Sequence, residues 1–289
     1  MVALKSYSLQ EVRKRLNEGS LPFSGVTEQG GCEFHFLSSS YYAGIAMHTG
    51  SRIRPELKES LSVKKSGRLR EEDPYADTFI KDFPVQIIAL DSRFEYDLNC
   101  DPQGAIYPFG KLKWGLNVWN RDLGMEERKL SIIKHREFHD LVDLTTLYLL
   151  KQNRYALIFD MHSYCYQREE EQNWFDDPRP EINLGTIPVN KKLFRDSIEQ
   201  FLKDLSGVRI EHHQVRVAEN EVFPGGYLSR RLSKKWYERV LVLAIEYKKI
   251  FMNEWTGELY SEILDVLVQS FRSASGNLIN SALFTDQTS

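Results

Sequence analysis

The sequence predicts an α/β fold with a mixed, mostly parallel sheet flanked by helices. Short apolar runs alternate along the chain with segments whose apolar residues recur at helical spacing. Strands that are apolar throughout are typical of parallel sheets covered by helices on both faces. No internal repeat and no long linker rich in Pro, Gly or Ser divides the 289 residues. We therefore expect a single domain over residues 1–289.

The predicted elements follow in order along the chain. Residues 7–18 form a short helix, in which Ser8 and Glu11 have the spacing of a capping box. The apolar runs predicted as buried strands are 41–50, 85–92, 154–163 and 240–249. The segments predicted as helices are 54–61, about 74–82, 126–152, 191–205 and about 257–272. The polar tail after about residue 272 is expected to be mobile.

Composition excludes several classes of protein. Aromatic residues make up 12% of the chain, which excludes a disordered protein, and the net charge of −3 argues against a dedicated nucleic-acid binder. No apolar run approaches the roughly 20 residues that cross a bilayer, and the first residues lack a secretory apolar region. The cysteines (Cys32, Cys100, Cys165) are too few for a disulfide scaffold, so we expect reduced thiols and a cytoplasmic location.

Polar side chains stand at the ends of three predicted strands. His48, His162 and Glu246 each come where an apolar run stops. Ligands of open α/β sheets bind at the carboxyl ends of the strands. If these three strands are parallel neighbours, the three side chains converge, although the sequence does not show the topology.

Each of these residues also has a structural interpretation. His48 can be a loop histidine bonded to local backbone. His162 and Asp160 face the same side of a strand, either as a ligand with its orienting carboxylate or as a satisfied core pair. Glu246 is a buried carboxylate that is either functional or paired with Lys248, Lys249 or an arginine.

Three loops carry further candidates. In REEDPYAD (70–77), Asp73 precedes a proline and either caps a helix or reaches the turn at His48. In DSRFEYDLN (91–99), Arg93 either grips a substrate carboxylate or pairs with Asp97. In PGGYLSR (224–230), the paired glycines permit close backbone approach or form an ordinary turn.

Taken in order, these motifs resemble those of the N-formylglutamate amidohydrolases. The motifs are MHTG, REEDPYAD, DSRFEYDLN, FDMHS, EINLGT, PGGYLSR and AIEYKKIFMNE, spread over about residues 40–255. The resemblance implies a sheet of the phosphorylase/hydrolase type, as in zinc carboxypeptidases. It also implies one divalent metal, expected to be zinc, and a small substrate that carries a carboxylate.

The resemblance implies a metal site of two histidines and one carboxylate. His48 and His162 match the family's histidines, Asp73 best matches the acidic ligand, and Glu72 is the fallback. Such a set leaves a position open for water, as in catalytic zinc sites. By the same resemblance, Glu246 matches the general base and then acid.

Other matched positions concern the substrate. Arg93 would stabilise the oxyanion or hold a carboxylate, and Arg230, behind Gly225 and Gly226, would bind an α-carboxylate. The matched positions with less defined roles are Asn99, Asn183 and His139.

One departure from the family pattern bears on the substrate. Cys100 stands where the family has an arginine, so that DLNR becomes DLNC. Losing a charge-assisted hydrogen bond there would cost about 1.5–3 kcal/mol, or roughly ten- to a hundredfold in binding. Three hypotheses stay open: a zinc-dependent amidohydrolase of N-formyl- or N-acyl-amino acids, a carboxypeptidase-like hydrolase of peptides or peptide conjugates, and a degenerate member that only binds. The sequence does not indicate the oligomeric state.

Overall fold

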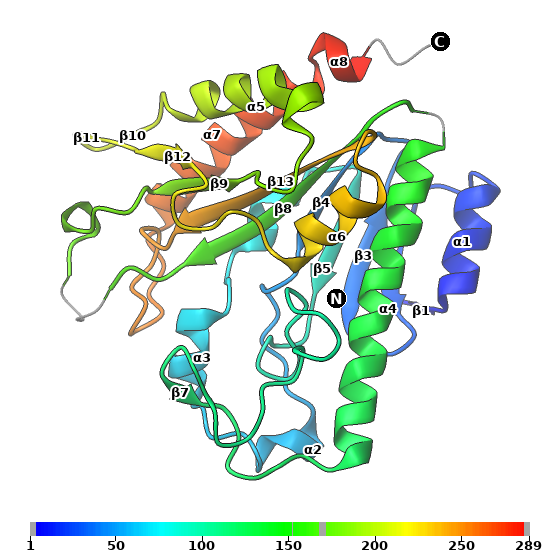
Figure 1. Cartoon of the computed structure of the whole chain (residues 1–289), viewed down its shortest axis with the longest axis vertical. Helices are drawn as coiled ribbons and strands as arrows, with labels where there is room; N and C mark the ends of the chain where they lie inside the picture. The colour runs from blue at the N-terminus through cyan, green and yellow to red at the C-terminus, as the bar shows by residue number, and fades with distance from the viewer. Residues whose placement is uncertain (1–3, 152, 168–171, 286–289) are drawn as a thin grey trace.

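A nine-stranded mixed sheet runs through the molecule (Figure 1). The computed structural model describes residues 4–151, 153–167 and 172–285. In spatial order the strands are β1 (Ser6–Tyr7), β2 (Phe23–Thr27), β3 (Cys32–Phe36), β5 (Val85–Ala89), β4 (Tyr42–Ala46), β8 (Ala156–Tyr164), β13 (Val240–Lys248), β9 (Ile182–Gly185) and β12 (Val217–Glu219). Five of the eight pairings are parallel, which confirms the predicted mixed, mostly parallel sheet.

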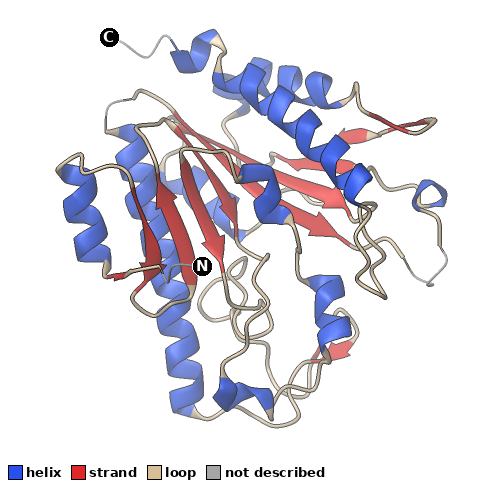
Figure 2. Ribbon diagram, turned by 180° about the vertical axis from the view of Figure 1, so that it is seen from behind, coloured by secondary structure: helices blue, strands red, loops and turns tan. Residues whose placement is uncertain are grey.

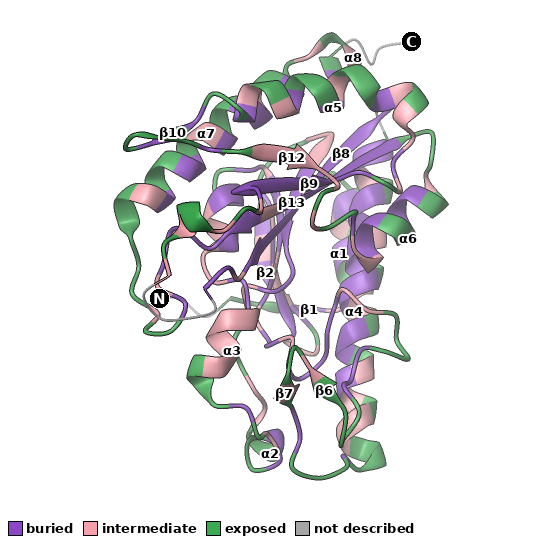
Figure 3. Cartoon of the chain, turned by 60° about the vertical axis from the view of Figure 1, so that its left-hand side comes forward, coloured by how far each residue is buried: buried purple, intermediate pink, exposed green. Residues whose placement is uncertain are grey.

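Helices cover both faces of this sheet (Figure 2). The core on one face takes apolar side chains from α1 (Leu9–Asn17), α4 (Met125–Leu150) and α6 (Tyr227–Lys235). The core on the other face takes them from α5 (Lys191–Leu205) and α7 (Ser261–Ile279). Figure 3 shows the central strands buried and the exposed residues gathered on loops and on the outer faces of helices. The central strands are apolar throughout because neither face of the sheet meets water.

The shorter elements lie mostly in the connections. They are α2 (Pro55–Lys58), α3 (Lys65–Glu71), the 3₁₀ helices η1 (Ala76–Ile80) and η2 (Trp174–Asp176), the hairpins β6 (Leu112–Lys113) with β7 (Leu116–Asn117) and β10 (Arg209–Ile210) with β11 (His213–Gln214), and the terminal α8 (Ala282–Thr285). Among the helices of the described residues, none is long and apolar enough to cross a membrane.

Most predicted elements are present, with shifted ends. The capping box at the start of α1 forms as expected, since the Ser8 hydroxyl accepts from the Glu11 amide and the Glu11 carboxylate accepts from the Ser8 amide. The helix expected over 54–61 is only the four-residue α2, and the one expected over 74–82 is the 3₁₀ helix η1. Neither segment has enough apolar residues at helical spacing to bury one face of a longer helix.

The last helix and the first strands of the sheet differ from what the sequence predicted. The last helix continues to Ile279 instead of stopping near residue 272, because Ala274 and Leu278 extend its buried face. β2 and β3 were not predicted from the sequence. Their residues alternate between buried and half-buried positions, which is the signature of strands at the side of a sheet.

The core under α7 gives a test of this arrangement. Phe271 is fully buried and packs against Phe83, Phe159 and Phe201. We expect Phe271→Ala to lower the free energy of unfolding by about 3–5 kcal/mol, because a large buried side chain is replaced by a cavity. Denaturant unfolding measures this loss, and Val266→Ala, at a position of α7 that is 39% exposed, is the matched control. A similar small loss in both variants would contradict the packing of α7.

Candidate active site

The three polar strand ends converge, because their strands are parallel neighbours. β4 pairs with β8 and β8 pairs with β13, all in parallel. Glu246 lies directly opposite His162 across the β13–β8 pair, and His48 follows the end of β4. The carboxyl ends of these strands face the long loops that carry α2, α3 and β7 (Figure 1). The three strands are therefore parallel neighbours, which is the condition under which the sequence predicts that these side chains converge.

His48, Asp73 and His162 form a candidate metal-binding triad. The Nδ1 atoms of His48 and His162 lie 3.4 Å and 3.2 Å from the same oxygen, Asp73 Oδ2. One ligand atom from each residue lies within 4.8 Å of the others, and all three residues are buried. Two imidazole nitrogens and one carboxylate oxygen suit a zinc-type cation.

Each histidine of the triad is backed by a carboxylate on its other nitrogen. His48 Nε2 is hydrogen-bonded to Asp97 Oδ1 at 2.9 Å, and His162 Nε2 lies 3.1 Å from Asp160 Oδ1 in an ion-pair contact without hydrogen-bond geometry. Carboxylates in this position fix the ring orientation and tautomer of histidines that bind metal. The Nδ1 atom of His48 is buried and has no hydrogen-bond partner in the described structure. An orphaned, oriented nitrogen beside Asp73 fits a metal ion.

The acidic surroundings of the triad favour a cation. Burial raises the pKa of Asp73, but the hydrogen bond from His162 and the close approach of His48 outweigh it and hold the pKa well below its usual range. Burial lowers the pKa of His162, yet the charges of Asp160 and Glu246 reverse this and raise it. Positive charge is therefore stabilised at the point where the three side chains meet.

Glu72 does not face the triad. Its carboxylate accepts from the Ser92 hydroxyl and from Arg68 Nε, the latter at 3.3 Å. Consecutive residues of an extended segment point to opposite sides, so only one of Glu72 and Asp73 can reach the histidines. The amide of Asp73 donates to the carbonyl of His48 at 2.8 Å, which fixes Asp73 against the His48 turn. The fallback ligand of the sequence analysis is thus placed elsewhere.

The turn after His48 is held against the neighbouring strand. A Cβ on Gly50 would lie 2.4 Å from the backbone of Leu90 and 2.5 Å from that of Asp91. Only glycine allows this approach. It packs the MHTG turn directly onto the DSRFEYDLN loop, whose Asp97 holds His48.

Glu246 lines a cavity of about 410 Å³ together with the triad. Burial is the main reason why its pKa is raised to about 7, with Asp73 and Asp160 also raising it and His162 opposing. Lys248 pairs with Glu181 at 2.7 Å, and Lys249 donates to the carbonyl of Glu72 at 2.7 Å. Within the part of the chain that the structure describes, no basic side chain forms an ion pair with Glu246. The described residues therefore give no support to the interpretation of Glu246 as one half of a structural ion pair.

Arg93 lines the cavity but is already engaged. Its Nη2 donates to Asp97 Oδ2 at 2.9 Å and its Nη1 to the carbonyl of Glu71 at 2.9 Å. Its guanidinium lies 4.6 Å from the ring centre of Trp114, a half-exposed residue at the turn of the β6–β7 hairpin. The ion pair that the sequence left open is present, while the cavity position of Arg93 is retained.

The positions matched to substrate binding divide into two groups. Asn99 lines the cavity, and its Oδ1 accepts from the amides of Tyr227 and Leu228 at the start of α6. Gly226 packs so closely on Asn99 that a Cβ would lie 2.2 Å from Asn99 Oδ1. Asn99 thus joins the DSRFEYDLN loop to the PGGYLSR loop.

The other matched positions lie outside the cavity lining. Asn183 is fully buried and binds the loop at Phe223 through its Nδ2, at 2.8 Å from the carbonyl. His139 Nε2 contacts the carbonyl of Leu98 at 3.1 Å from α4. Arg230 is exposed and donates to the carbonyl of Gly225 at 2.9 Å. These residues shape the loops around the cavity, and Gly225, at φ +118°, is part of the same turn.

Several cavity residues were missed by the sequence analysis. The further lining residues are Arg70, Glu71, Trp114, Ser163, Tyr164, Cys165, Arg179, Phe223 and Lys249. Arg70 and Glu71 stand beside Asp73 in a motif already singled out, and Ser163 to Cys165 follow His162. Arg179 lies in an irregular polar loop without a recognisable motif, so only the folded chain reveals it.

Cys100 is half-buried, and burial chiefly raises the pKa of its thiol to about 11. The thiol is therefore protonated at neutral pH and poorly suited to act as a nucleophile. His135 contacts the carbonyl of Cys100 at 2.9 Å and not its sulfur.

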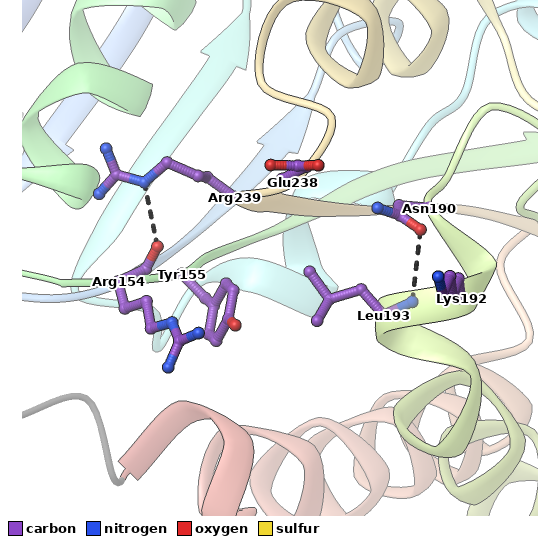
Figure 4. Close-up of a pocket in the computed structure, with 7 residues that line it drawn as sticks. All are labelled: Arg154, Tyr155, Asn190, Lys192, Leu193, Glu238 and Arg239. Carbon is purple, nitrogen blue, oxygen red and sulfur yellow. Dashed lines mark hydrogen bonds between the residues drawn. The ribbon is translucent and has the colours of Figure 1, made fainter.

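A second, larger cavity of about 590 Å³ lies at the opposite edge of the sheet (Figure 4). It opens where β8 and β13 begin, and its lining includes Tyr155, Asn190 and Arg239. None of its lining residues belongs to the triad or is a histidine. The volume of a cavity therefore does not identify which of the two contains the candidate catalytic residues.

Comparisons with known proteins agree with the geometry. The family model of N-formylglutamate amidohydrolase matches residues 45–252. The chain belongs to the N-formylglutamate amidohydrolase family. The crystal structure of N-formylglutamate amidohydrolase from Ralstonia eutropha has 19% identity and a TM-score of 0.63, over 85% of this chain and 97% of that one. A gene product of Agrobacterium tumefaciens has 16% identity and a TM-score of 0.58, over 86% and 96%. Among curated proteins, none matches this sequence significantly.

The distinction between Asp73 and Glu72 can be tested by metal content. We expect about one equivalent of a divalent metal in the purified wild type and in Glu72→Gln, and a loss in Asp73→Asn, because only Asp73 faces both histidines. Elemental analysis after dialysis measures the bound metal. Metal loss in Glu72→Gln with retention in Asp73→Asn would reverse the assignment.

Proposed function

We propose that this protein is a zinc-dependent hydrolase that cleaves the amide bond of an N-formyl- or N-acyl-amino acid. The observation that carries the proposal is the triad of His48, Asp73 and His162, with a carboxylate behind each histidine and Glu246 in the same cavity. Family membership supports the hydrolase class. Two histidines and one carboxylate are a ligand set typical of catalytic zinc.

The residues of the cavity suit amide hydrolysis. When bound, zinc would make water nucleophilic at neutral pH and polarise the amide carbonyl. Glu246, opposite His162 in the sheet, would accept the proton of the attacking water. It would then donate that proton to the amine nitrogen as the C–N bond breaks, which yields a carboxylic acid and a free amine. A carboxyl group with a raised pKa is suited to both transfers.

The cavity also has groups that can position the substrate. Arg93 faces the cavity through a guanidinium that Asp97 and the carbonyl of Glu71 hold in place. A fixed cation near the reacting carbonyl would stabilise the developing oxyanion without reorganisation. Asp97 would therefore orient both Arg93 and His48.

Two alternatives make different predictions for the same protein. A carboxypeptidase-like hydrolase would release C-terminal residues from peptides and would not turn over N-acyl-amino acids. A degenerate member would bind its ligand without zinc-dependent turnover. The retained triad and the unpaired Glu246 favour an enzyme, and Cys100 is the departure that favours a changed substrate.

We also keep a cytoplasmic location as a prediction. Its basis is the three cysteines, which are all free thiols in the structure.

The role of Glu246 provides the main test. In zinc-loaded protein assayed with a panel of N-formyl-L-amino acids, Glu246→Gln is expected to lower kcat by at least about a hundredfold, since an amide cannot carry the proton. Zinc content is expected to stay near one equivalent.

The exposed Glu238→Gln, far from this cavity, is the matched control and should keep wild-type kcat. Undiminished turnover in Glu246→Gln would contradict the mechanism. Release of C-terminal residues from peptides alone would select the carboxypeptidase-like alternative.

A further inference from the structure

The cationic side chains of the active-site cavity differ in how far they are engaged by the protein. Four of them line it: Arg70, Arg93, Arg179 and Lys249. The charges of Lys249, Arg93 and Arg70 all act on Glu71, the one lining carboxylate besides Asp73 and Glu246. The positive charges of three of the four cations are thus partly compensated by the carboxylate of Glu71, which lines the same cavity.

Those three cations also bind backbone. Lys249 is fully buried and donates to the carbonyls of Arg70 and Glu72. Arg93 donates to the carbonyl of Glu71 and to Asp97. Arg70 donates to the carbonyl of Gln167 at 2.7 Å, and its guanidinium lies 4.1 Å from the ring centre of Trp255. Their contacts indicate that they hold the loops around Asp73 in place.

Arg179 is held in a different way. Asp177 accepts from its Nε at 2.9 Å and from its Nη2 at 2.6 Å, a two-point contact along one edge of the guanidinium. A fork of this kind fixes the plane of the guanidinium and leaves the other edge directed elsewhere. The Nη1 atom makes no hydrogen bond among the described residues. The side chain is 27% exposed and lines the cavity.

Tyr164 sets the position of Arg179 relative to the triad. The guanidinium lies 5.3 Å from the centre of the Tyr164 ring, and the Tyr164 hydroxyl donates to the carbonyl of Pro180. Tyr164 is two residues after His162 on β8, so the two side chains share one face of the strand. At the rise of a strand, this places their Cα atoms roughly 6.6 Å apart.

The cavity that Arg179 and the triad share can hold a substrate of the size of one amino acid. In an N-acyl-amino acid, only the amide nitrogen and Cα separate the scissile carbonyl from the α-carboxylate. A carbonyl near the triad therefore leaves the α-carboxylate within the same cavity, whose wall includes Tyr164 and Arg179.

We propose that Arg179, fixed by Asp177 over Tyr164, binds the α-carboxylate of the substrate and so determines specificity for α-carboxylates over α-carboxamides. The inference deepens the proposed function and rests on it. It assigns to the irregular loop before β9 the role that the sequence analysis gave to Arg230. Arg230 is exposed and lies outside the cavity lining.

The test compares N-formyl-L-glutamate with N-formyl-L-isoglutamine, which has a carboxamide in place of the α-carboxylate. For the acid, Arg179→Gln is expected to lower kcat/KM about ten- to a hundredfold, the loss typical of one charge-assisted contact. For the carboxamide, kcat/KM is expected to change less than about twofold. Arg179→Lys, which keeps the charge but loses the two-point fork, is expected to fall between Arg179→Gln and wild type.

Controls separate this role from general effects on the protein. Arg209→Gln, at an exposed position of β10, should leave both substrates unaffected. Thermal unfolding of each variant shows whether it is folded. If Arg179→Gln does not fold, Arg179→Lys carries the comparison.

Binding by calorimetry to zinc-loaded Glu246→Gln provides a readout without turnover. Turnover by wild type with no difference between Arg179→Gln and wild type would overturn the inference and leave the proposed function standing. Tighter binding of the acid that depends on Arg179, without turnover by wild type, would support the inference and overturn the proposed function. A loss of acid preference in Arg230→Gln instead of Arg179→Gln, or neither binding nor turnover of the acid, would overturn the inference.

Discussion

Asp73 must stay ionised in a buried position between two histidines, and the surrounding structure is arranged around that requirement. A lone buried carboxylate would cost several kcal/mol or take up a proton. Here His48 and His162 approach one of its oxygens, the Ser163 hydroxyl lies 3.3 Å from the other, and the charge of Lys249 lies nearby. The contacts that keep Asp73 charged also orient the two histidines. The charge balance of the triad and its geometry therefore depend on the same interactions.

The sheet topology solves the problem of bringing these groups together. Because β4, β8 and β13 are parallel neighbours, residues distant in sequence end at one edge without any special loop. The fold class could be predicted, and the convergence could be predicted only for strands that are parallel neighbours, since apolar runs that stop at His48, His162 and Glu246 are visible in the sequence. The order of the strands could not, because it depends on pairings between segments that are far apart.

Side-chain direction was also beyond the sequence. Glu72 and Asp73 are chemically similar neighbours. The alternation of the extended segment and the hydrogen bond from the Asp73 amide to the carbonyl of His48 determine which one faces the triad. The two arginines Arg230 and Arg179 show the same limit. Arg230 follows a recognisable glycine motif yet is exposed, whereas Arg179 lies in an irregular loop and lines the cavity. Motifs identify residue types at strand ends well, but loop conformation decides which of them share a cavity.

The contacts of the site join segments that are far apart in the chain, and this has a consequence for how the protein folds. His48 and Asp97 are 49 residues apart, Asn99 and Tyr227 are 128 apart, and Lys249 and Glu72 are 177 apart. Closing such large loops has a high entropic cost, so contacts of this kind form late in folding. The cavity itself combines residues from β8 and β13 with loops that come much earlier in the chain. A chain emerging from the ribosome can therefore complete this cavity only after residue 249 has been synthesised, because Glu246 and Lys249 line it beside the triad.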